Sequence, residues 1–264
     1  MTLTTAAGTQ VQVNGTSLYV EEHGQGDPLV LVQPGLLAGG VYAGVAALLG
    51  EQYRVITFDN RGHGRSTNPS SEMSYELFAE DTVALIEALK LERPFVGGWS
   101  DGGQVALEIG VRYPDLARAL IVGAASLELQ SDASHEMMRS FFQVNVDGVV
   151  DFDEFAAGHG QMMLPMLRRF HPHGEEHWQS VLQRSATMWL AYAGLTREQV
   201  ATIETPALVI QGDRDDVIPV DEGVKIYRWL PNAELAILPG ADHMRPIFDP
   251  TVFAHVVSDF LQRH

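Results

Sequence analysis

Hydrophobic residues in this chain fall into short runs that recur along most of its length. Residues 10–13 and 17–20 alternate polar and apolar positions around Asn14-Gly15, which is typical of a β-hairpin. Continuous apolar runs follow at residues 29–32, 54–58, 94–97, 119–123, 207–211 and 234–238. Helical patterns, notably that from Leu77 to Lys90, alternate with these runs. The alternation predicts an α/β protein with a mostly parallel central sheet and helices on both faces.

The interval from residue 128 to 200 interrupts this alternation. We expect a helical cap over residues 128–200, inserted after the sixth strand into a core built from residues 1–127 and 201–264. The cap is rich in methionine and aromatic side chains. Because flexible thioethers adapt to irregular apolar ligands, this composition favours a small hydrophobic or aromatic substrate. Packing of the cap onto the core is the competing interpretation of the same side chains.

Composition sets outer limits on partners and compartment. The 264 residues, 45% of them hydrophobic, are enough for one α/β domain with an insertion. A net charge of -17 disfavours binding to nucleic acid, to anionic membranes or to polyanionic substrates. The chain has no cysteine, which excludes disulfides and thiolate catalysis. Its first residues lack the basic and apolar segments of a signal peptide, so a cytoplasmic location is expected.

The candidate nucleophile is Ser100, within Gly98-Trp99-Ser100-Asp101-Gly102. This motif follows an apolar run and precedes a helical stretch from Gln104 to Arg112, so the serine lies on a sharp turn between a strand and a helix. Glycines leave room for such a turn, which exposes the hydroxyl. The motif alone is weak evidence and needs partners elsewhere in the chain.

Candidate partners follow two later apolar runs. Asp213, Asp215 and Asp216 come directly after the run that ends near Gly212, and His243 follows the run at 234–238. A serine needs a base within hydrogen-bond reach, and the base needs a carboxylate that fixes its tautomer. The order serine, carboxylate, histidine supplies these three roles.

Four motifs together resemble the α/β-hydrolase fold family along nearly the whole chain. They are Gly98 to Gly103, Phe58 to Ser66, Gly212 to Asp215 with Pro219, and Pro239 to His243. The resemblance implies a catalytic triad of Ser100, Asp215 and His243, because Asp215 has the spacing of that family's acid. It implies no cofactor and no metal. Some members place the acid after the sixth strand, which makes Glu128 the rival to Asp215.

The oxyanion hole departs from the family pattern. The usual His-Gly pair after the third strand is replaced by Gln33-Pro34, and Pro34 has no N–H to donate. We expect the first donor to be the N–H of Gly35, with Leu36 as the alternative if the loop is shifted by one residue. The second donor is the N–H of Asp101. Candidate pocket residues are Leu36, Trp99, Trp189 and Met244.

Two other patterns suggest metals and are given less weight. Residues 147–155 resemble the second half of an EF-hand calcium loop, but Gln143 stands where its first aspartate belongs, which favours an acidic helix start. His171, His173 and His177 are separated by proline and glycine and share no fixed face. His63, between two glycines after the fourth strand, is expected to be structural.

These features predict a serine hydrolase that cleaves a carboxylic ester or lactone through an acyl-enzyme. Two alternatives remain open. A carbon-carbon bond hydrolase of ring-fission type would use the same triad, and a slow-turnover small-molecule receptor would use the same fold.

Overall fold

The computed structural model describes residues 8–127 and 129–264. Its centre is an eight-stranded sheet with the order β1-β2-β4-β3-β5-β6-β7-β8. The strands are β1 (Thr9–Val13), β2 (Thr16–His23), β3 (Asp27–Val32), β4 (Tyr53–Phe58), β5 (Phe95–Trp99), β6 (Leu120–Gly123), β7 (Ala207–Gly212) and β8 (Ala233–Leu238). Strand β2 pairs antiparallel with β1 and β4, and every pair from β4 to β8 is parallel. The predicted α/β class and mostly parallel sheet are confirmed.

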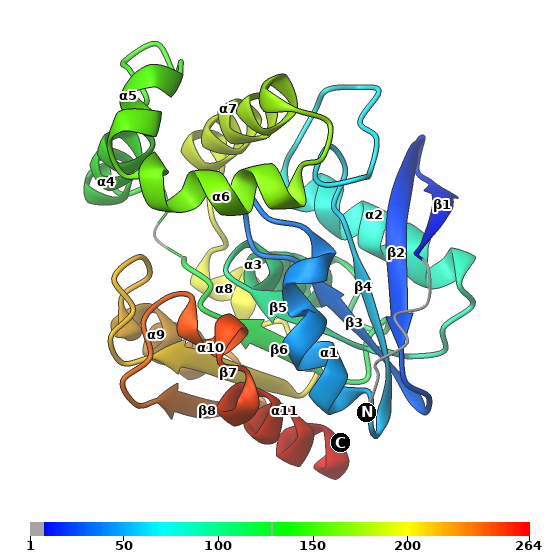
Figure 1. Cartoon of the computed structure of the whole chain (residues 1–264). Helices are drawn as coiled ribbons and strands as arrows, with labels where there is room; N and C mark the ends of the chain where they lie inside the picture. Colours follow the sequence, from blue (N-terminus) through cyan, green and yellow to red (C-terminus); the bar gives the residue numbers. More distant parts are fainter. Residues whose placement is uncertain (1–7, 128) are drawn as a thin grey trace.

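The two faces of the sheet are covered by different helices (Figure 1). The helices are η1 (Gly39–Tyr42), α1 (Ala43–Leu49), α2 (Tyr75–Ala88), α3 (Asp101–Arg112), α4 (Asp132–Phe142), α5 (Phe152–Ala157), α6 (Gly160–Phe170), α7 (Glu175–Ala191), α8 (Arg197–Val200), α9 (Val220–Trp229), α10 (Arg245–Phe248) and α11 (Thr251–Arg263). Helices α2, α3, α8 and α9 share one buried cluster with the sheet, and α1, α10 and α11 share the other. Both faces are therefore shielded from water, as the continuous apolar runs predict.

Local sequence explains where several elements begin and end. Asn14 and Gly15 both have positive φ, at 42° and 72°, as a tight hairpin turn requires. Helix α2 begins two residues before the predicted Leu77, because the Ser74 hydroxyl accepts the Leu77 N–H at 3.0 Å. It ends before Lys90, whose φ of 54° is left-handed.

Helices α4 to α7 lie between β6 and β7 in the chain and stand over one end of the sheet (Figure 1). Within this interval the described residues form no strand of the central sheet. Several of the expected aromatic side chains pack among themselves: Phe155 and Trp178 are fully buried with ring centroids 6.3 Å apart. Both side chains belong to the buried cluster that also contains α2, α3 and one face of the sheet, while Met162 is 80% exposed.

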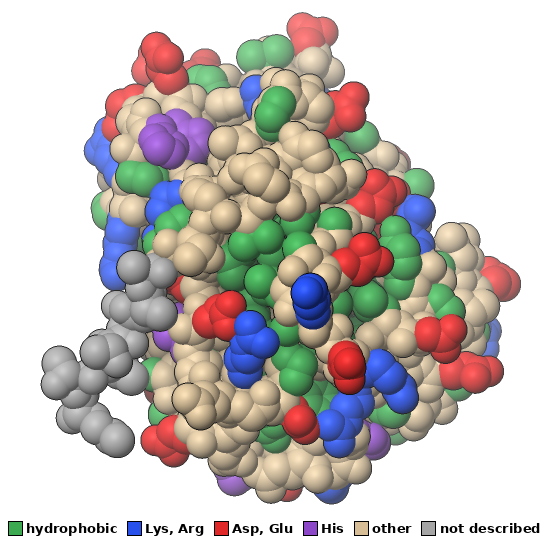
Figure 2. Space-filling model, turned by 90° about the vertical axis from the view of Figure 1, so that its right-hand side faces the viewer, with side chains coloured by type: hydrophobic (Ala, Val, Ile, Leu, Met, Phe, Trp, Pro, Cys, Tyr) green, Lys and Arg blue, Asp and Glu red, His purple; other side chains and the backbone are tan. Residues whose placement is uncertain are grey.

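Charges are mixed on the surface that Figure 2 shows. Asp and Glu side chains are interspersed with Lys and Arg there, and hydrophobic side chains occupy the middle of that face. No helix in the described part of the chain is long and apolar enough to span a membrane.

Candidate active site

The predicted nucleophile lies at the turn between β5 and α3. Ser100 has φ 58° and ψ -119°, a left-handed conformation that a non-glycine residue rarely adopts. Its N–H donates to the carbonyl of Gly123 at 2.8 Å, and its carbonyl accepts the first helical bond of α3, from Gln104. Bonds on both sides hold the strained residue in place, and Ser100 is partly exposed.

Two glycines around Ser100 are required by close backbone packing. A Cβ on Gly98 would lie 2.3 Å from the carbonyl oxygen of Val32 in β3, and a Cβ on Gly102 would lie 2.0 Å from it. No side chain fits at these distances. The glycines therefore let α3 approach the end of β3, which brings the nucleophile turn beside the predicted oxyanion loop.

The predicted acid and base are hydrogen-bonded to each other. His243 Nδ1 lies 2.9 Å from Asp215 Oδ2 and 3.0 Å from Oδ1. The Asp215 carboxylate is fully buried and also accepts the N–H groups of Val217 and Ile218 and the side-chain amide of Gln211. With Nδ1–H donated to the carboxylate, Nε2 of His243 is left as the acceptor that a base requires.

His243 is fixed against the nucleophile turn through Trp99. The indole Nε1 of Trp99 donates to the carbonyl of His243 at 2.7 Å, and the two rings lie 6.2 Å apart. Among the described residues, the Ser100 hydroxyl forms no hydrogen bond with His243. In free enzymes this bond is often long and tightens when substrate binds.

The candidate oxyanion donors lie together at this turn. Asp101 begins α3, and Gly35 follows β3 close enough that a Cβ there would lie 2.6 Å from Asp101 Oδ2. Leu36 has a φ of 62°, so the loop after β3 turns sharply at the residue next to Gly35. Gly35 and Leu36 thus both lie beside the start of α3. The sequence-based expectation that Gly35 is the first donor, with Leu36 as the alternative, stays a prediction.

The side chain of Asp101 links the nucleophile turn to helices α2 and α7. It accepts the Tyr75 hydroxyl at 2.7 Å and the Trp189 indole N–H at 3.1 Å. Burial raises the pKa of the Asp101 carboxyl to about 6, against the lowering effect of these two donors. Above that pH the site contains a carboxylate directly beside the predicted oxyanion hole.

The four candidate pocket residues differ in their surroundings. Leu36 is 2% exposed and Trp189, which bonds Asp101, is 6% exposed, whereas Met244 is only partly buried. Trp99 is fully buried and packs edge-on against Phe253 at 5.9 Å. Trp99 therefore supports the histidine loop from below, and contact of any of these four with a substrate stays a prediction.

Two buried residues that sequence reasoning did not select also shape the site. Tyr42 donates its hydroxyl to the Val32 carbonyl and accepts the Trp99 N–H, both at 2.9 Å, which joins β3 to β5 just before the nucleophile. Gln33 is fully buried and donates to the Leu37 carbonyl at 2.6 Å. In the sequence, Gln33 is marked only by the replacement of the family's His-Gly pair with Gln33-Pro34.

The rival acids and the calcium-like segment lie outside the predicted triad. Asp213 and Asp216 are exposed, and Glu128 lies outside the described residues. Asp151 caps α5 by accepting the Glu154 N–H at 2.9 Å, an acidic helix start as expected. Within residues 8–127 and 129–264, no group of three or more His, Asp or Glu side chains could hold a metal ion.

Two of the three histidines in the other metal candidate bond to the backbone, and the third, His173, is exposed. His171 and His177 lie near the carbonyls of Leu36 and Gly62, at 2.8 and 3.0 Å. His63 is buried, with Nδ1 3.2 Å from the Arg61 carbonyl. These contacts give His63 the structural surroundings that its position between glycines predicts.

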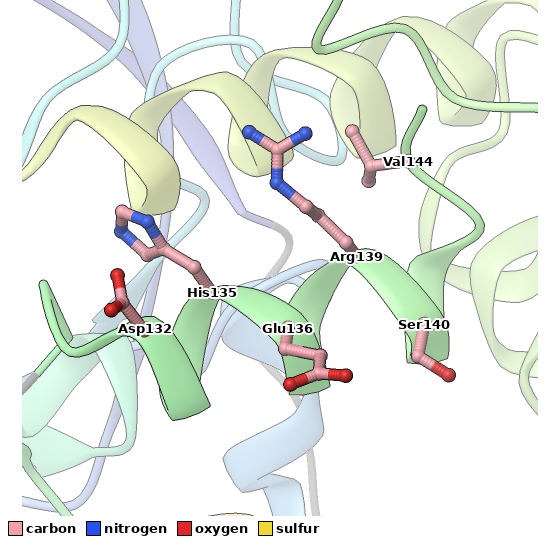
Figure 3. Close-up of a pocket in the computed structure, with 6 residues that line it drawn as sticks. All are labelled: Asp132, His135, Glu136, Arg139, Ser140 and Val144. Atoms are coloured by element: carbon pink, nitrogen blue, oxygen red, sulfur yellow. The ribbon is translucent and has the colours of Figure 1, made fainter. Parts of the chain in front are cut away.

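A hollow of about 520 Å³ lies away from these residues, along α4 (Figure 3). It is lined by Asp132, His135, Glu136, Arg139, Ser140 and Val144. Most of these side chains come from a single helix, and none belongs to the predicted triad.

Comparison with known proteins identifies the family of the chain. A model of the alpha/beta hydrolase family matches residues 29–256. The chain belongs to this family. This alpha/beta hydrolase is 25% identical to human serine hydrolase BPHL, over 98% of this chain and 88% of that protein. It is 24% identical to 2-hydroxymuconate semialdehyde hydrolase from Pseudomonas sp. strain CF600, over 96% of this chain and 93% of that protein.

The fold of this hydrolase is similar to that of a thermophilic esterase from Thermogutta terrifontis. The two align with a TM-score of 0.79 and 21% identity, over 98% of this chain and 99% of that one. Of these three proteins, the hydrolase from Pseudomonas carries a substrate in its name. The likeness to the esterase concerns the fold.

Proposed function

We propose that this protein is a serine hydrolase that cleaves a carboxylic ester or lactone of a small hydrophobic substrate through an acyl-enzyme. The observation that carries the proposal is the Asp215–His243 hydrogen bond beside a strained, partly exposed serine. That arrangement leaves one imidazole nitrogen free to take a proton from the hydroxyl.

The proposed reaction has two halves. Ser100 Oγ attacks the carbonyl carbon while His243 Nε2 takes the hydroxyl proton, and the oxyanion is held by the N–H groups of Gly35 and Asp101. The tetrahedral intermediate collapses, and His243 returns the proton to the leaving alkoxide. Water then gives a proton to His243 and attacks the acyl carbon. The second tetrahedral intermediate collapses with cleavage of the bond to Ser100 Oγ, which takes the proton back from His243 as the acid leaves. Asp215 keeps the imidazole in one tautomer throughout.

The surroundings of the nucleophile favour a substrate without negative charge near the scissile bond. Above pH 6, the buried carboxylate of Asp101 adds its charge to a protein with a net charge of -17. An anionic substrate would have to approach this carboxylate closely.

The second candidate is hydrolysis of a carbon-carbon bond in a ring-fission product. Its support is the relative named 2-hydroxymuconate semialdehyde hydrolase, which matches 96% of this chain. The same three residues can serve this reaction, but its dienoate substrates are anionic. Turnover measured side by side with a short-chain chromogenic ester and a ring-fission dienoate separates the two.

The test of the proposal is kinetic. Ser100→Ala is expected to lower kcat/KM for the preferred ester at least ~10³-fold, and Asp215→Asn by a comparable factor because the imidazole tautomer is lost. Asp216→Asn, an exposed neighbour, is the matched control and should retain activity. Unchanged turnover in Ser100→Ala excludes the proposed nucleophile. Binding of a ligand without turnover by the unaltered protein would favour a receptor.

A further inference from the structure

The loop after β3, residues 33–39, contains the candidate oxyanion donors and is held at several points from within the core. Gln33 spans it, because its side-chain amide donates to the Leu37 carbonyl while its carbonyl oxygen accepts the Asn60 N–H at 3.0 Å. At the far end, the Gly39 N–H donates to Asp59 at 2.9 Å. These contacts fix both ends of the loop and leave its centre, at Leu36, to other partners.

A histidine from the cap meets the centre of this loop. His171 follows α6 directly and is 1% exposed. Its Nε2 lies 2.8 Å from the Leu36 carbonyl, and its Nδ1 accepts the Gly64 N–H at 3.0 Å. Since Nδ1 is an acceptor, the ring proton is on Nε2 and is donated to Leu36. One imidazole therefore joins the cap, the oxyanion loop and the turn after β4.

The contact falls on a residue that needs external support. Leu36 has a left-handed φ of 62° and a side chain that is 2% exposed. A branched residue in this conformation costs about 1–3 kcal/mol and persists only when its surroundings fix it. The hydrogen bond to the Leu36 carbonyl orients the peptide that follows Leu36, which is one peptide unit from the Leu36 N–H and two from the Gly35 N–H.

We propose that His171 is a positioning residue for the oxyanion hole, through which docking of the cap sets the orientation of the Gly35 and Leu36 N–H groups. This inference rests on the proposed serine hydrolase activity. The role requires a neutral ring, because an imidazolium cannot accept the Gly64 N–H. Burial lowers the pKa of His171 to about 4, which keeps the ring neutral at neutral pH.

Three variants separate the two hydrogen bonds of the ring. His171→Asn keeps an acceptor near the Gly64 N–H and removes the donor to Leu36. His171→Gln places an amide N–H near the former Nε2 and restores that donor. His173→Asn, two residues along the chain and exposed, is the matched control. Thermal unfolding of each variant reports whether it folds.

The readouts are steady-state turnover of a short-chain chromogenic ester and inhibition by a trifluoromethyl ketone, whose adduct with Ser100 carries an oxyanion. A misplaced oxyanion donor lowers kcat, so His171→Asn should lose at least ~10-fold in kcat and in inhibitor affinity, with KM changed less than ~3-fold. His171→Gln should recover to within ~3-fold of the unaltered protein, and His173→Asn should match it.

Several results would overturn the inference. One is unaltered kcat and inhibitor affinity in a folded His171→Asn protein while Ser100→Ala is inactive; another is a rise in KM alone. Activity retained by Ser100→Ala instead refutes the proposed function itself. If His171→Asn does not fold, ¹⁵N-histidine NMR of the unaltered protein replaces it. A slowly exchanging His171 Nε2–H whose shift moves on adduct formation supports the role, and an unmoved signal contradicts it.

Discussion

Acidification should destabilise this fold through its buried histidines, and His63 is the sharpest test. His63 is 1% exposed, and burial, followed by repulsion from His171, lowers its pKa from 6.5 to about 3. Between pH 6.5 and 3, His63 is therefore protonated in the unfolded chain and neutral in the folded chain. The stability that this group contributes is fully present above pH 6.5 and is lost as the pH falls toward 3.

The magnitude follows from the size of this window. Each pH unit below 6.5 costs about 1.4 kcal/mol per histidine, so lowering the pH from 7.5 to 4.5 should remove about 3 kcal/mol through His63. The rise in the pKa of Asp101 to about 6 acts in the opposite direction, because the folded state binds that proton more readily. The contributions of Asp101 and of the net charge are the same in the unaltered protein and in a His63 variant, so they cancel when the two losses of stability are compared.

The assay is denaturant unfolding of the unaltered protein and of His63→Asn at pH 7.5 and 4.5. Asparagine does not titrate, so the variant should lose about 3 kcal/mol less than the unaltered protein over this interval, whatever its stability at pH 7.5. Equal losses in the two proteins would refute the reasoning, since they would mean that His63 binds no extra proton on unfolding.

Three further substitutions test contacts around the nucleophile. Gly102→Ala should destabilise the protein by about 3 kcal/mol in thermal or denaturant unfolding, because the new Cβ would lie 2.0 Å from the Val32 carbonyl oxygen. Gly40→Ala is the control and should be neutral, because its Cβ would have its nearest neighbour at 3.8 Å. Tyr42→Phe should cost about 1–3 kcal/mol in the same assay, since it leaves two buried peptide groups unpaired. Asp101→Asn should raise the ratio of kcat/KM for a hemisuccinate ester to kcat/KM for the matched butyrate ester by roughly 30-fold at pH 8. The estimate takes the Asp101 carboxylate and the free carboxylate of the substrate to lie ~8 Å apart at an effective dielectric constant of ~20. An unchanged ratio would contradict electrostatic selection of the substrate.

Much of the sheet could be predicted because both of its faces are buried. Apolar runs at 29–32 and 207–211 coincide with β3 and β7, and the hairpin turn at Asn14-Gly15 follows from the two residues that tolerate positive φ. The meeting of Asp215 and His243 was predictable for a related reason: each follows the carboxyl end of a parallel strand, and such ends lie at one edge of a sheet.

The contacts that support the site could not be predicted in this way. His171 bonds Leu36 and Gly64, which are 135 and 107 residues away, and no local pattern encodes a contact over that separation. The sequence placed only the backbone N–H of Asp101 in the site, and nothing in it indicated that the Asp101 side chain bonds Tyr75 and Trp189. These contacts join residues from elements far apart in the chain, and tertiary packing decides them.

The most direct test of the central claim is the chemical identity of the intermediate. Protein quenched in acid during turnover of a slowly deacylated chromogenic ester should gain the mass of one acyl group, and peptide mapping should locate it on Ser100. Asp216→Asn should acquire the same label, and Ser100→Ala should acquire none. A label on another residue, or steady turnover by Ser100→Ala without any label, would contradict the account.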